Sequence, residues 1–197
     1  MIDLAKTVFI LDGPSDIKSF TAKLQKEFDQ TPDFRKAPSN GHTVSPEGYA
    51  NGVWGIVNFA LNSTYLHIFC ILDREKRDLS AESLAKKVKD KLISLVEESG
   101  TISVDEFSKK IRVVVADRMF ENWIVADIQG IREKGTYIKQ DAEQGHFDGQ
   151  SGVNVLKNIM QTNYDKVQHA PILFKAVCFD RAVQNSPSFS NLIRAME

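Results

Sequence analysis

The sequence predicts an α/β protein in which a mainly parallel sheet is flanked by helices and followed by a C-terminal helical extension. Three short apolar runs carry this prediction, at residues 7–11, 65–72 and 111–116. Continuous apolar runs of this length are typical of strands buried on both faces, as in a parallel sheet. Each run is followed by a segment whose apolar residues have helical spacing, which is the pattern of repeated strand–helix units.

The remaining elements follow from local signals along the chain. The first helix, at residues 15–28, has apolar residues at three- and four-residue spacing on one face. Prolines and glycines mark residues 31–48 as a loop, with a short strand near residues 34–37. Ser45 is placed to cap a helix that reaches Leu61. Further helices are predicted at residues 80–98, 120–126, 153–160, 171–182 and 188–196.

These elements form two parts of one domain, which suits a chain of 197 residues. Residues 1–130 are predicted to form the α/β core. Residues 131–197 are predicted to form a loop and a C-terminal helical layer packed on that core. The loop is expected at residues 132–152, which are polar and rich in glycine.

Composition narrows the functional class. The formal net charge of −1 and the pI of about 6.4 give no global attraction to nucleic acid, so any such contact needs a local basic patch. Cys70 and Cys178 lie within apolar runs, which indicates reduced core cysteines and no disulfide framework. No run approaches the roughly 18 apolar residues that a membrane span needs, and no signal peptide is recognised. We therefore expect a cytoplasmic protein without a membrane partner.

Pairs of acidic residues follow two of the predicted strands. Asp12 ends the first strand and Asp16 lies in the first turn of the next helix, while Asp73 and Glu75 follow the strand at 65–72. Ligands and metals usually sit at the carboxyl ends of the strands in open α/β sheets. Taken alone, Asp12 suits a turn and Asp16 suits a helix N-terminus, but two strand ends that each carry a pair of acids favour a site for Mg²⁺ or Mn²⁺.

A third acidic cluster follows the strand at 111–116. Asp117 and Glu121 are four residues apart, with Glu121 on the first turn of the next helix. Stabilisation of the helix N-terminus is the favoured role for Asp117. Glu121 is the better candidate for the site.

Several common sites have no sequence signal. The four histidines lack the spacing of a zinc site, and there is no P-loop, no dinucleotide-binding glycine motif and no nucleophile elbow. The acidic clusters are therefore the main candidates for chemistry.

The acidic motifs resemble those of the TOPRIM fold, the metal-binding domain of topoisomerases, primases and OLD-type nucleases. That fold has an acidic residue followed by glycine after its first strand, as in Asp12-Gly13, and a DxD-like pair after a later strand, as in Asp73-Arg74-Glu75. A TOPRIM-like family of uncharacterised bacterial proteins, often encoded beside ATPases in defence islands, is more similar still.

Three motifs of that family have counterparts here, in the same order along the chain. Its EGPTE motif is similar to residues 12–16 (DGPSD), its E-x-W-x-x-A-D motif is similar to residues 121–127, and its closing S-P-S-F is similar to residues 186–189. The chain departs from the family in having aspartate at positions 12 and 16 and glutamate at 75. Each change moves a carboxylate by about one methylene, to which catalytic geometry is sensitive.

The resemblance implies a divalent-metal-dependent nuclease that hydrolyses phosphodiesters, in defence against phage or mobile elements together with an ATPase. The ligands of a Mg²⁺ or Mn²⁺ ion would be Asp12, Asp16, Asp73, Glu75 and Glu121. The catalytic residues would be Asp12, Asp73 and Glu75, with Lys157 as the cation beside the scissile phosphate.

The local basic patch for nucleic acid is predicted at Arg74, Lys76, Arg77 and Arg118, and DNA is favoured over RNA as the substrate. Two alternatives remain open, because a fold alone does not decide a function. The chain could be a non-catalytic, TOPRIM-shaped binding subunit of an ATPase complex, or a hydrolase of nucleotides or phosphate esters. A homodimer is an open alternative to a monomer.

Overall fold

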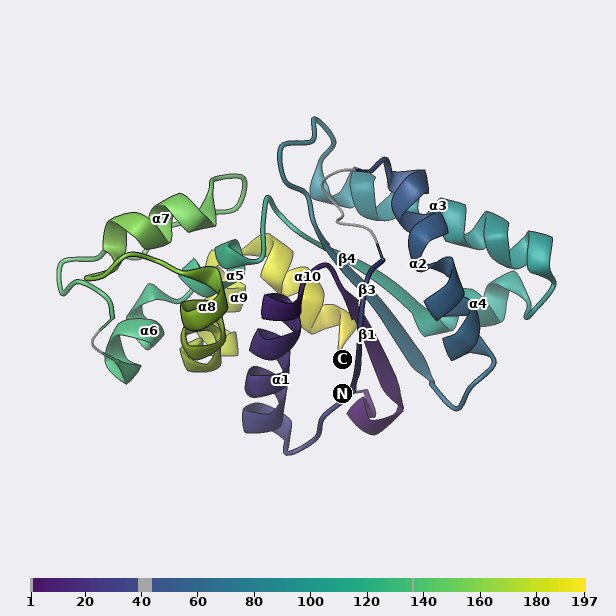
Figure 1. The fold of residues 1–197 in the computed structure, drawn as a ribbon, viewed down its shortest axis with the longest axis horizontal. Coiled ribbons are helices and arrows are strands. Elements are labelled where there is room, and N and C mark those ends of the chain that lie inside the picture. The colour runs from purple at the N-terminus through teal and green to yellow at the C-terminus, as the bar shows by residue number, and fades with distance from the viewer. Residues whose placement is uncertain (1, 39–43, 136) are drawn as a thin grey trace.

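The computed structural model describes residues 2–38, 44–135 and 137–197. Its centre is a four-stranded, all-parallel sheet with strand order β2-β1-β3-β4 (Figure 1). The predicted α/β class and parallel sheet are confirmed. The strands are β1 (Thr7–Leu11), β2 (Asp33–Lys36), β3 (His67–Asp73) and β4 (Ile111–Ala116).

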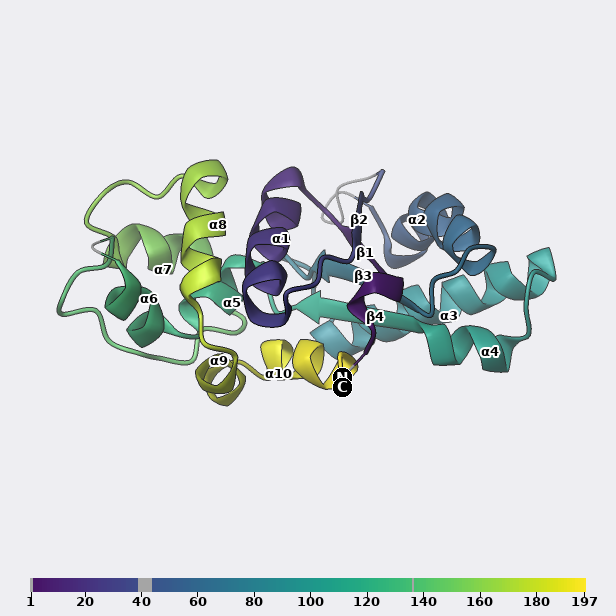
Figure 2. The same cartoon turned by 90° about the horizontal axis from the view of Figure 1, so that it is seen from below.

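Helices cover both faces of the sheet, with α2, α3 and α4 on one side and α1 and α10 on the other (Figures 1 and 2). In the described ranges, none of the helices is long and apolar enough to cross a membrane. The helices are η1 (Leu4–Lys6), α1 (Pro14–Phe28), α2 (Pro46–Leu61), α3 (Ala81–Ser99), α4 (Val104–Lys110), α5 (Glu121–Val125), α6 (Ile128–Lys134), α7 (Gly152–Ile159), α8 (Lys166–Ala176), α9 (Phe179–Asn185) and α10 (Pro187–Ala195).

Successive residues of each inner strand point to opposite faces and supply two apolar cores. On β1, Phe9 and Leu11 pack toward α1, whereas Val8 and Ile10 pack toward α2 and α3. All four are at most 1% exposed, as expected for a strand covered on both faces. The apolar run in the sequence therefore reflects burial on both faces rather than on one.

The C-terminal helices share the core on the α1 side of the sheet. A cluster of aromatic rings joins α1, the β4–α5 connection, α8 and α10, with ring centroids 5.3 Å apart for Phe20 and Phe174 and 4.8 Å apart for Phe120 and Phe174. The Trp123 indole N–H donates to Ser188 Oγ at 2.8 Å, which ties α5 to α10. Residues distant in the sequence are thus packed directly against the first strand–helix unit.

One helical prediction needs correction. Residues 171–182 do not form one helix, because α8 already begins at Lys166 and ends at Ala176, before α9 begins at Phe179. Pro171 lies inside α8 rather than at its start. The cap that starts α8 is Asp165, whose side chain accepts a hydrogen bond from the backbone N–H of Gln168 at 2.8 Å.

Asp127, the last residue of the E-x-W-x-x-A-D motif, joins the core to the C-terminal helices. Its fully buried carboxylate accepts the backbone N–H of Gly130 at 3.0 Å and that of Cys178 at 2.6 Å. The guanidinium of Arg181 binds the same carboxylate through Nε at 2.7 Å and Nη2 at 3.2 Å. A Cβ atom on Gly130 would lie 2.1 Å from this carboxylate, so the contact needs glycine there. The buried carboxylate, through these contacts, fixes α9 against α6.

We expect Asp127→Ala to lower the free energy of unfolding by about 2 kcal/mol, because the N–H groups of Gly130 and Cys178 lose their acceptor and the partly exposed guanidinium of Arg181 loses its partner. Urea denaturation monitored by circular dichroism measures the change. Asp180→Ala, at an exposed neighbouring position, is the matched control and should stay within about 0.5 kcal/mol of wild type. Equal stabilities of the two variants would show that the Asp127 contacts do not hold the helices together.

Candidate functional site

The sheet has its topological switch point between β1 and β3. The chain passes from β1 to β2 on one side and then crosses to β3 and β4 on the other. Helix α1, which follows β1, and helix α3, which follows β3, cover opposite faces, so the two connections diverge at the carboxyl ends of these strands. Such a divergence creates the crevice in which open α/β sheets bind ligands. Asp12 follows β1 and Asp73 ends β3, so both lie at this crevice.

Four carboxylates gather there. Asp12, Asp16 and Asp73 line a small cavity whose walls include the rings of Phe120 and Trp123. The cavity has room for about one water molecule or ion. Asp16 is brought in by the first turn of α1, where Gly13 leaves space for its carboxylate, since a Cβ there would lie 3.2 Å from Oδ2.

Glu121 is the fourth carboxylate and the first residue of α5. It is only 1% exposed, and Asp16 is 5% exposed. The start of α7 packs tightly over this turn, since a Cβ on Gly152 would lie 2.6 Å from the carbonyl carbon of Glu121. Both acidic side chains are therefore held inside the protein, where an uncompensated charge is costly.

Lys166 supplies a positive charge between two of the carboxylates. Its ammonium nitrogen lies 3.0 Å from Asp16 Oδ1 and 3.5 Å from Glu121 Oε1. The hydroxyl of Tyr164 donates to Glu121 Oε1 at 3.1 Å. These two residues come from the segment that leads into α8, and sequence reasoning missed both of them. The predicted helix begins at residue 171, so this segment was assigned to the connection before the helix and not to the site.

The charges in the cluster act strongly on one another. Many protein atoms surround the carboxylate of Asp73 although the residue is partly exposed, and this desolvation raises its pKa well above the usual range. Lys166 opposes the increase, whereas the charges of Asp16, Glu121 and Asp12 add to it. Desolvation would lower the pKa of Lys166, but Glu121, Asp16 and Asp73 outweigh it and raise that pKa. Lys166 therefore stays protonated at neutral pH.

The donor set can be tested against a divalent metal ion. In the described part of the chain, no group of three or more His, Cys, Asp or Glu side chains forms a ready metal cluster. Lys166 instead occupies the space between Asp16 and Glu121. Carboxylate oxygens are the ligands that Mg²⁺ and Mn²⁺ prefer. The described residues therefore offer the oxygen donors that suit a divalent ion but no preformed group of three ligands, and Asp12 and Asp73 beside the cavity are the ones that would hold it.

A comparison with protein families matches residues 15–197 to a family described as a domain of unknown function, DUF4276. The chain belongs to this family. The matched range includes Asp16, Asp73, Glu121 and Lys166 and begins three residues after Asp12. Comparisons with curated proteins and with solved structures found no match.

Other charged residues in this DUF4276 domain that were predicted for the site serve the loops around it. Arg74 forms an ion pair with Asp117 that ties the β3–α3 loop to the β4–α5 loop. Arg77 donates to the carbonyl oxygens of Asp73 at 3.0 Å and Val44 at 3.2 Å. Asp117 thus joins two loops, and it is neither the cap of α5, which is Phe120, nor an acid of the first turn of that helix.

Three further residues predicted for metal or nucleic acid lie in the same loops. Glu75 adopts a left-handed conformation, with φ of 56°, in the turn after β3 and does not line the cavity. Arg118 also has a positive φ, 87°, and donates to the carbonyl oxygen of Gly149 at 3.3 Å. Lys76 is exposed at the tip of the β3–α3 loop.

Lys157, the predicted cation, lies elsewhere. Its side chain is exposed on α7, and none of the ion pairs among the described residues joins it to a carboxylate of the cluster. The lysine beside the carboxylates is Lys166. The difference follows from the path of residues 160–166, which return the chain from α7 to the start of α8 beside α1.

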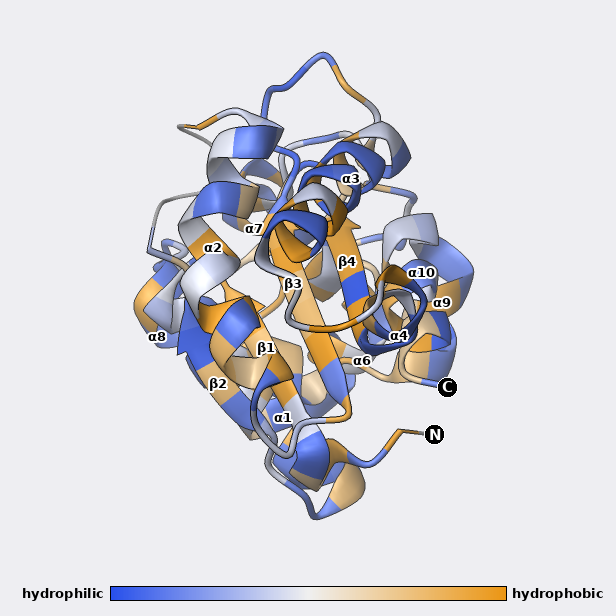
Figure 3. Ribbon diagram, turned by 90° about the vertical axis from the view of Figure 1, so that its right-hand side faces the viewer, coloured by the Kyte–Doolittle hydropathy of each residue, from blue (hydrophilic) through white to orange (hydrophobic). Residues whose placement is uncertain are grey.

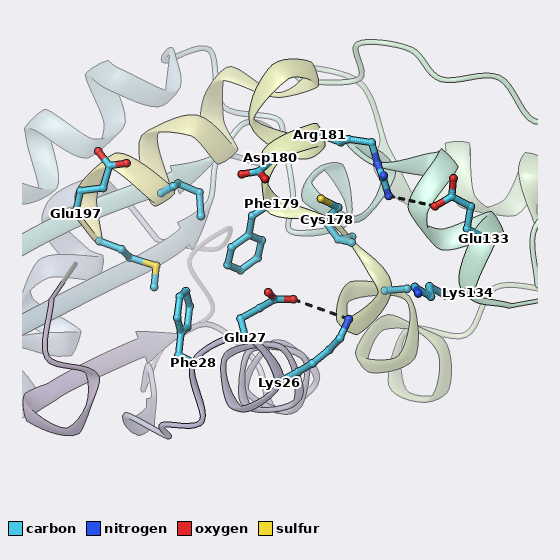
Figure 4. A pocket seen from close by; sticks show the side chains of 14 residues that line it. Lys26, Glu27, Phe28, Glu133, Lys134, Cys178, Phe179, Asp180, Arg181 and Glu197 are labelled. Atoms are coloured by element: carbon cyan, nitrogen blue, oxygen red, sulfur yellow. Dashed lines mark ion pairs between the residues drawn. The ribbon is translucent and has the colours of Figure 1, made fainter.

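A larger cavity lies away from the carboxylates. It measures about 600 Å³ and lies between the C-terminal end of α1 and helices α6, α9 and α10 (Figure 4). Lys26 on its wall is ten residues along α1 from Asp16, or about 15 Å. Ion pairs within its walls, Arg181 with Glu133 and Lys26 with Glu27, satisfy part of its charge. Its side chains form no cluster comparable with that at the switch point.

We expect Asp73→Asn to stabilise the metal-free protein, with an effect that grows as the pH rises. The raised pKa of Asp73 favours its neutral form in the folded state. Its contribution to stability is therefore present below the unfolded pKa of about 3.9 and is lost as the pH rises through the folded pKa. Asparagine is neutral throughout, so the difference in melting temperature between variant and wild type should increase from about pH 4 and then level off.

Thermal unfolding in a chelating buffer across the pH range measures this difference. Asp78→Asn, at an exposed position in the same loop, is the control and should show a constant small difference. A pH-independent difference for Asp73→Asn would contradict the desolvation of the Asp73 carboxylate.

Proposed function

We propose that this chain is a divalent-metal-dependent nuclease of TOPRIM type, which hydrolyses phosphodiester bonds. The observation that carries the proposal is the gathering of Asp12, Asp16 and Asp73 around a small cavity at the switch point of the sheet, beside Glu121 and the ammonium group of Lys166. Asp16, Glu121 and Asp73 all act electrostatically on this one ammonium group, so the cluster attracts further positive charge. A metal-bound phosphate would bring both a second cation and the substrate.

The positions of the acids support the TOPRIM likeness. The Asp-Gly pair follows β1, the DxD-like pair follows β3, and these strands are direct neighbours in the sheet. The register pairs Leu11 with Ile71, so that Asp12 and Asp73 extend from adjacent strand ends. An arrangement of this kind is expected if one ion is shared between the two motifs.

In the proposed site, Asp12 and Asp73 hold a Mg²⁺ or Mn²⁺ ion. Such an ion, when bound, activates a water molecule and stabilises the charge that develops on the phosphate. Hydrolysis joins the water oxygen to phosphorus and breaks the bond to one ester oxygen, which leaves with a proton. Asp73 must be deprotonated to bind the ion, and its raised pKa makes this step sensitive to pH.

Lys166 has a separate role in this proposal. Because its pKa is raised, it does not accept a proton at neutral pH and acts as a fixed positive charge. Placed beside the cavity, it stabilises negative charge on the scissile phosphate. Asp16 and Glu121 hold its ammonium group in place, and the Tyr164 hydroxyl in turn orients Glu121.

DNA remains the proposed substrate and an ATPase the proposed partner. Of the predicted basic patch, Arg74 and Arg77 are engaged in loop contacts, and Lys76 is the exposed member at the loop tip. With fewer free basic side chains, the chain alone is expected to bind nucleic acid weakly. A partner protein that binds the DNA and brings it to the site would make up for this weak binding.

One observation favours a second candidate, a non-catalytic subunit of an ATPase complex. Lys166 compensates Asp16 and Glu121 without any metal ion. A site whose acids are already paired could serve only to stabilise the fold. The two candidates differ in whether the protein binds a divalent ion.

We expect millimolar Mn²⁺ or Mg²⁺ to raise the melting temperature of the wild type, because a ligand that binds only the folded state stabilises it by mass action. The increase should be absent in Asp73→Asn and retained in Asp78→Asn. Differential scanning fluorimetry with a chelator control measures the three proteins. Wild type without an increase would exclude the metal-dependent nuclease and leave the binding subunit.

Cleavage is then tested on single- and double-stranded DNA, on RNA and on a generic phosphomonoester, with wild type and Asp73→Asn compared at equal concentration. Metal-dependent cutting of a polynucleotide that is lost in Asp73→Asn supports the nuclease. Turnover of the phosphomonoester alone would show a phosphate-ester hydrolase instead.

Lys166→Met should have opposite effects on metal binding and on cleavage. Removal of the ammonium group deletes a competitor for the carboxylates, so we expect Mn²⁺ to bind more tightly. Cleavage should nevertheless fall by about 100-fold, since a preorganised positive charge at the phosphate is lost. Isothermal titration calorimetry measures affinity and stoichiometry, for which we expect one ion per chain in the wild type. Weaker metal binding and lower activity together would show that Lys166 only supports the fold.

A further inference from the structure

The outer edge of β4 lies in a groove of about 350 Å³ between α3 and α10. In the strand order, β4 is the last strand, and among the described residues it pairs with β3 alone. Figure 3 shows it as a mainly apolar strand at the margin of the sheet. The groove is lined by five consecutive residues of β4, Ile111 to Val115, by Ala81, Glu82, Ala85 and Lys89 of α3, and by Asn191 and Ala195 of α10.

The two edges of the sheet differ in their protection. The opposite edge strand, β2, has the sequence DFRK and carries three charged residues, which is a common way to prevent pairing with another strand. The sequence of β4 is IRVVVA, and its one charged residue is Arg112. Arg112 donates to the carbonyl oxygens of Lys109 and Ile111, both at or before the start of the strand. The centre of β4, at Val113, therefore lacks the charges that protect an edge.

We propose that β4 pairs antiparallel with β4 of a second copy of this chain across a two-fold axis, so that the two sheets form one continuous sheet. An exposed apolar strand edge is a template for such pairing. Closed two-fold dimers are the commonest assemblies of identical chains, and they need a surface that is complementary to itself. The charged residues of α3 that line the groove, Glu82 and Lys89, make this surface complementary to itself.

Glu82, Ala85 and Lys89 lie on one face of α3, since residues three and seven positions apart share a face of a helix. Under a two-fold axis that passes near Ala85, the two α3 helices run antiparallel. Glu82 of each copy then faces Lys89 of the other. The ion pairs among the described residues include neither side chain, so both are available for this contact.

The walls of the groove permit close approach. The side chains of Ala81 and Ala85 on α3 and of Ala195 on α10 are small. Small residues let a second backbone come near the strand edge, where paired strands lie about 4.8 Å apart. Because the strands in the dimer are antiparallel, the two carboxylate clusters lie at opposite ends of the joined sheet. The proposal is therefore independent of metal binding and of nuclease activity.

Charge reversal on α3 tests the dimer. Wild type should sediment as a dimer of about twice 22.1 kDa. Glu82→Lys or Lys89→Glu alone places two like-charged pairs across the axis and should weaken the dimer at least ~10-fold in dissociation constant. The double variant E82K/K89E restores opposite charges and should restore the dimer. Analytical ultracentrifugation over a concentration series measures all four proteins.

Thermal unfolding confirms that each variant is folded, and both changed positions are on the helix surface. Wild type that is monomeric at about 100 μM, far above the dissociation constants of stable dimers, would overturn the proposal and leave the edge for a strand of another protein. A dimer that neither single change weakens, or that the double change fails to restore, would overturn it as well.

Discussion

The parallel pairing of β1 with β3 is the constraint on which the carboxylate cluster depends. Leu11 pairs with Ile71, so the register continues to Leu72 opposite Asp12, and Asp73 lies one residue farther along the neighbouring strand. Because side chains alternate between the two faces of a strand, a slip of one residue in β3 would turn Asp73 toward the opposite face of the sheet. Burial of the strand on both faces excludes such a slip, since Phe69 and Cys70 would exchange cores.

The second constraint is the packing of the C-terminal helices against α1. Lys166 reaches Asp16 only because α8 lies along α1, where Phe174 contacts Phe20 and Phe120. Asp127 fixes the far end of the same layer through Arg181 and the backbone of Cys178. Residues 121–127 therefore have two roles: Glu121 contributes a carboxylate to the site, and Asp127 fixes the helical layer that contains Lys166.

The strands of the sheet could be predicted from the sequence, whereas only part of the site could. Apolar runs between turn residues predicted β1 and β4 with their observed bounds, because two-sided burial leaves a continuous signal. Asp12 and Asp73 could be placed because parallel strands end at the same edge. Lys166 could not, since its position depends on contacts between segments far apart in the chain. Pro171 added an error, because proline favours the first turn of a helix and here lies in its interior.

Asp127 is an example, in the same chain, of a buried acid whose role is structural. Asp127 has a guanidinium and two backbone N–H groups for one carboxylate, and its charge is fully compensated. At the switch point, Asp16 and Glu121 share Lys166, and the pKa of Asp73 is raised by desolvation and by the charges of the neighbouring carboxylates. Apolar residues of similar size would make a more stable structure at such a place. Clusters of carboxylates that raise the pKa of one another are typical of functional sites, and this arrangement supports the proposed binding of a cation from outside the chain.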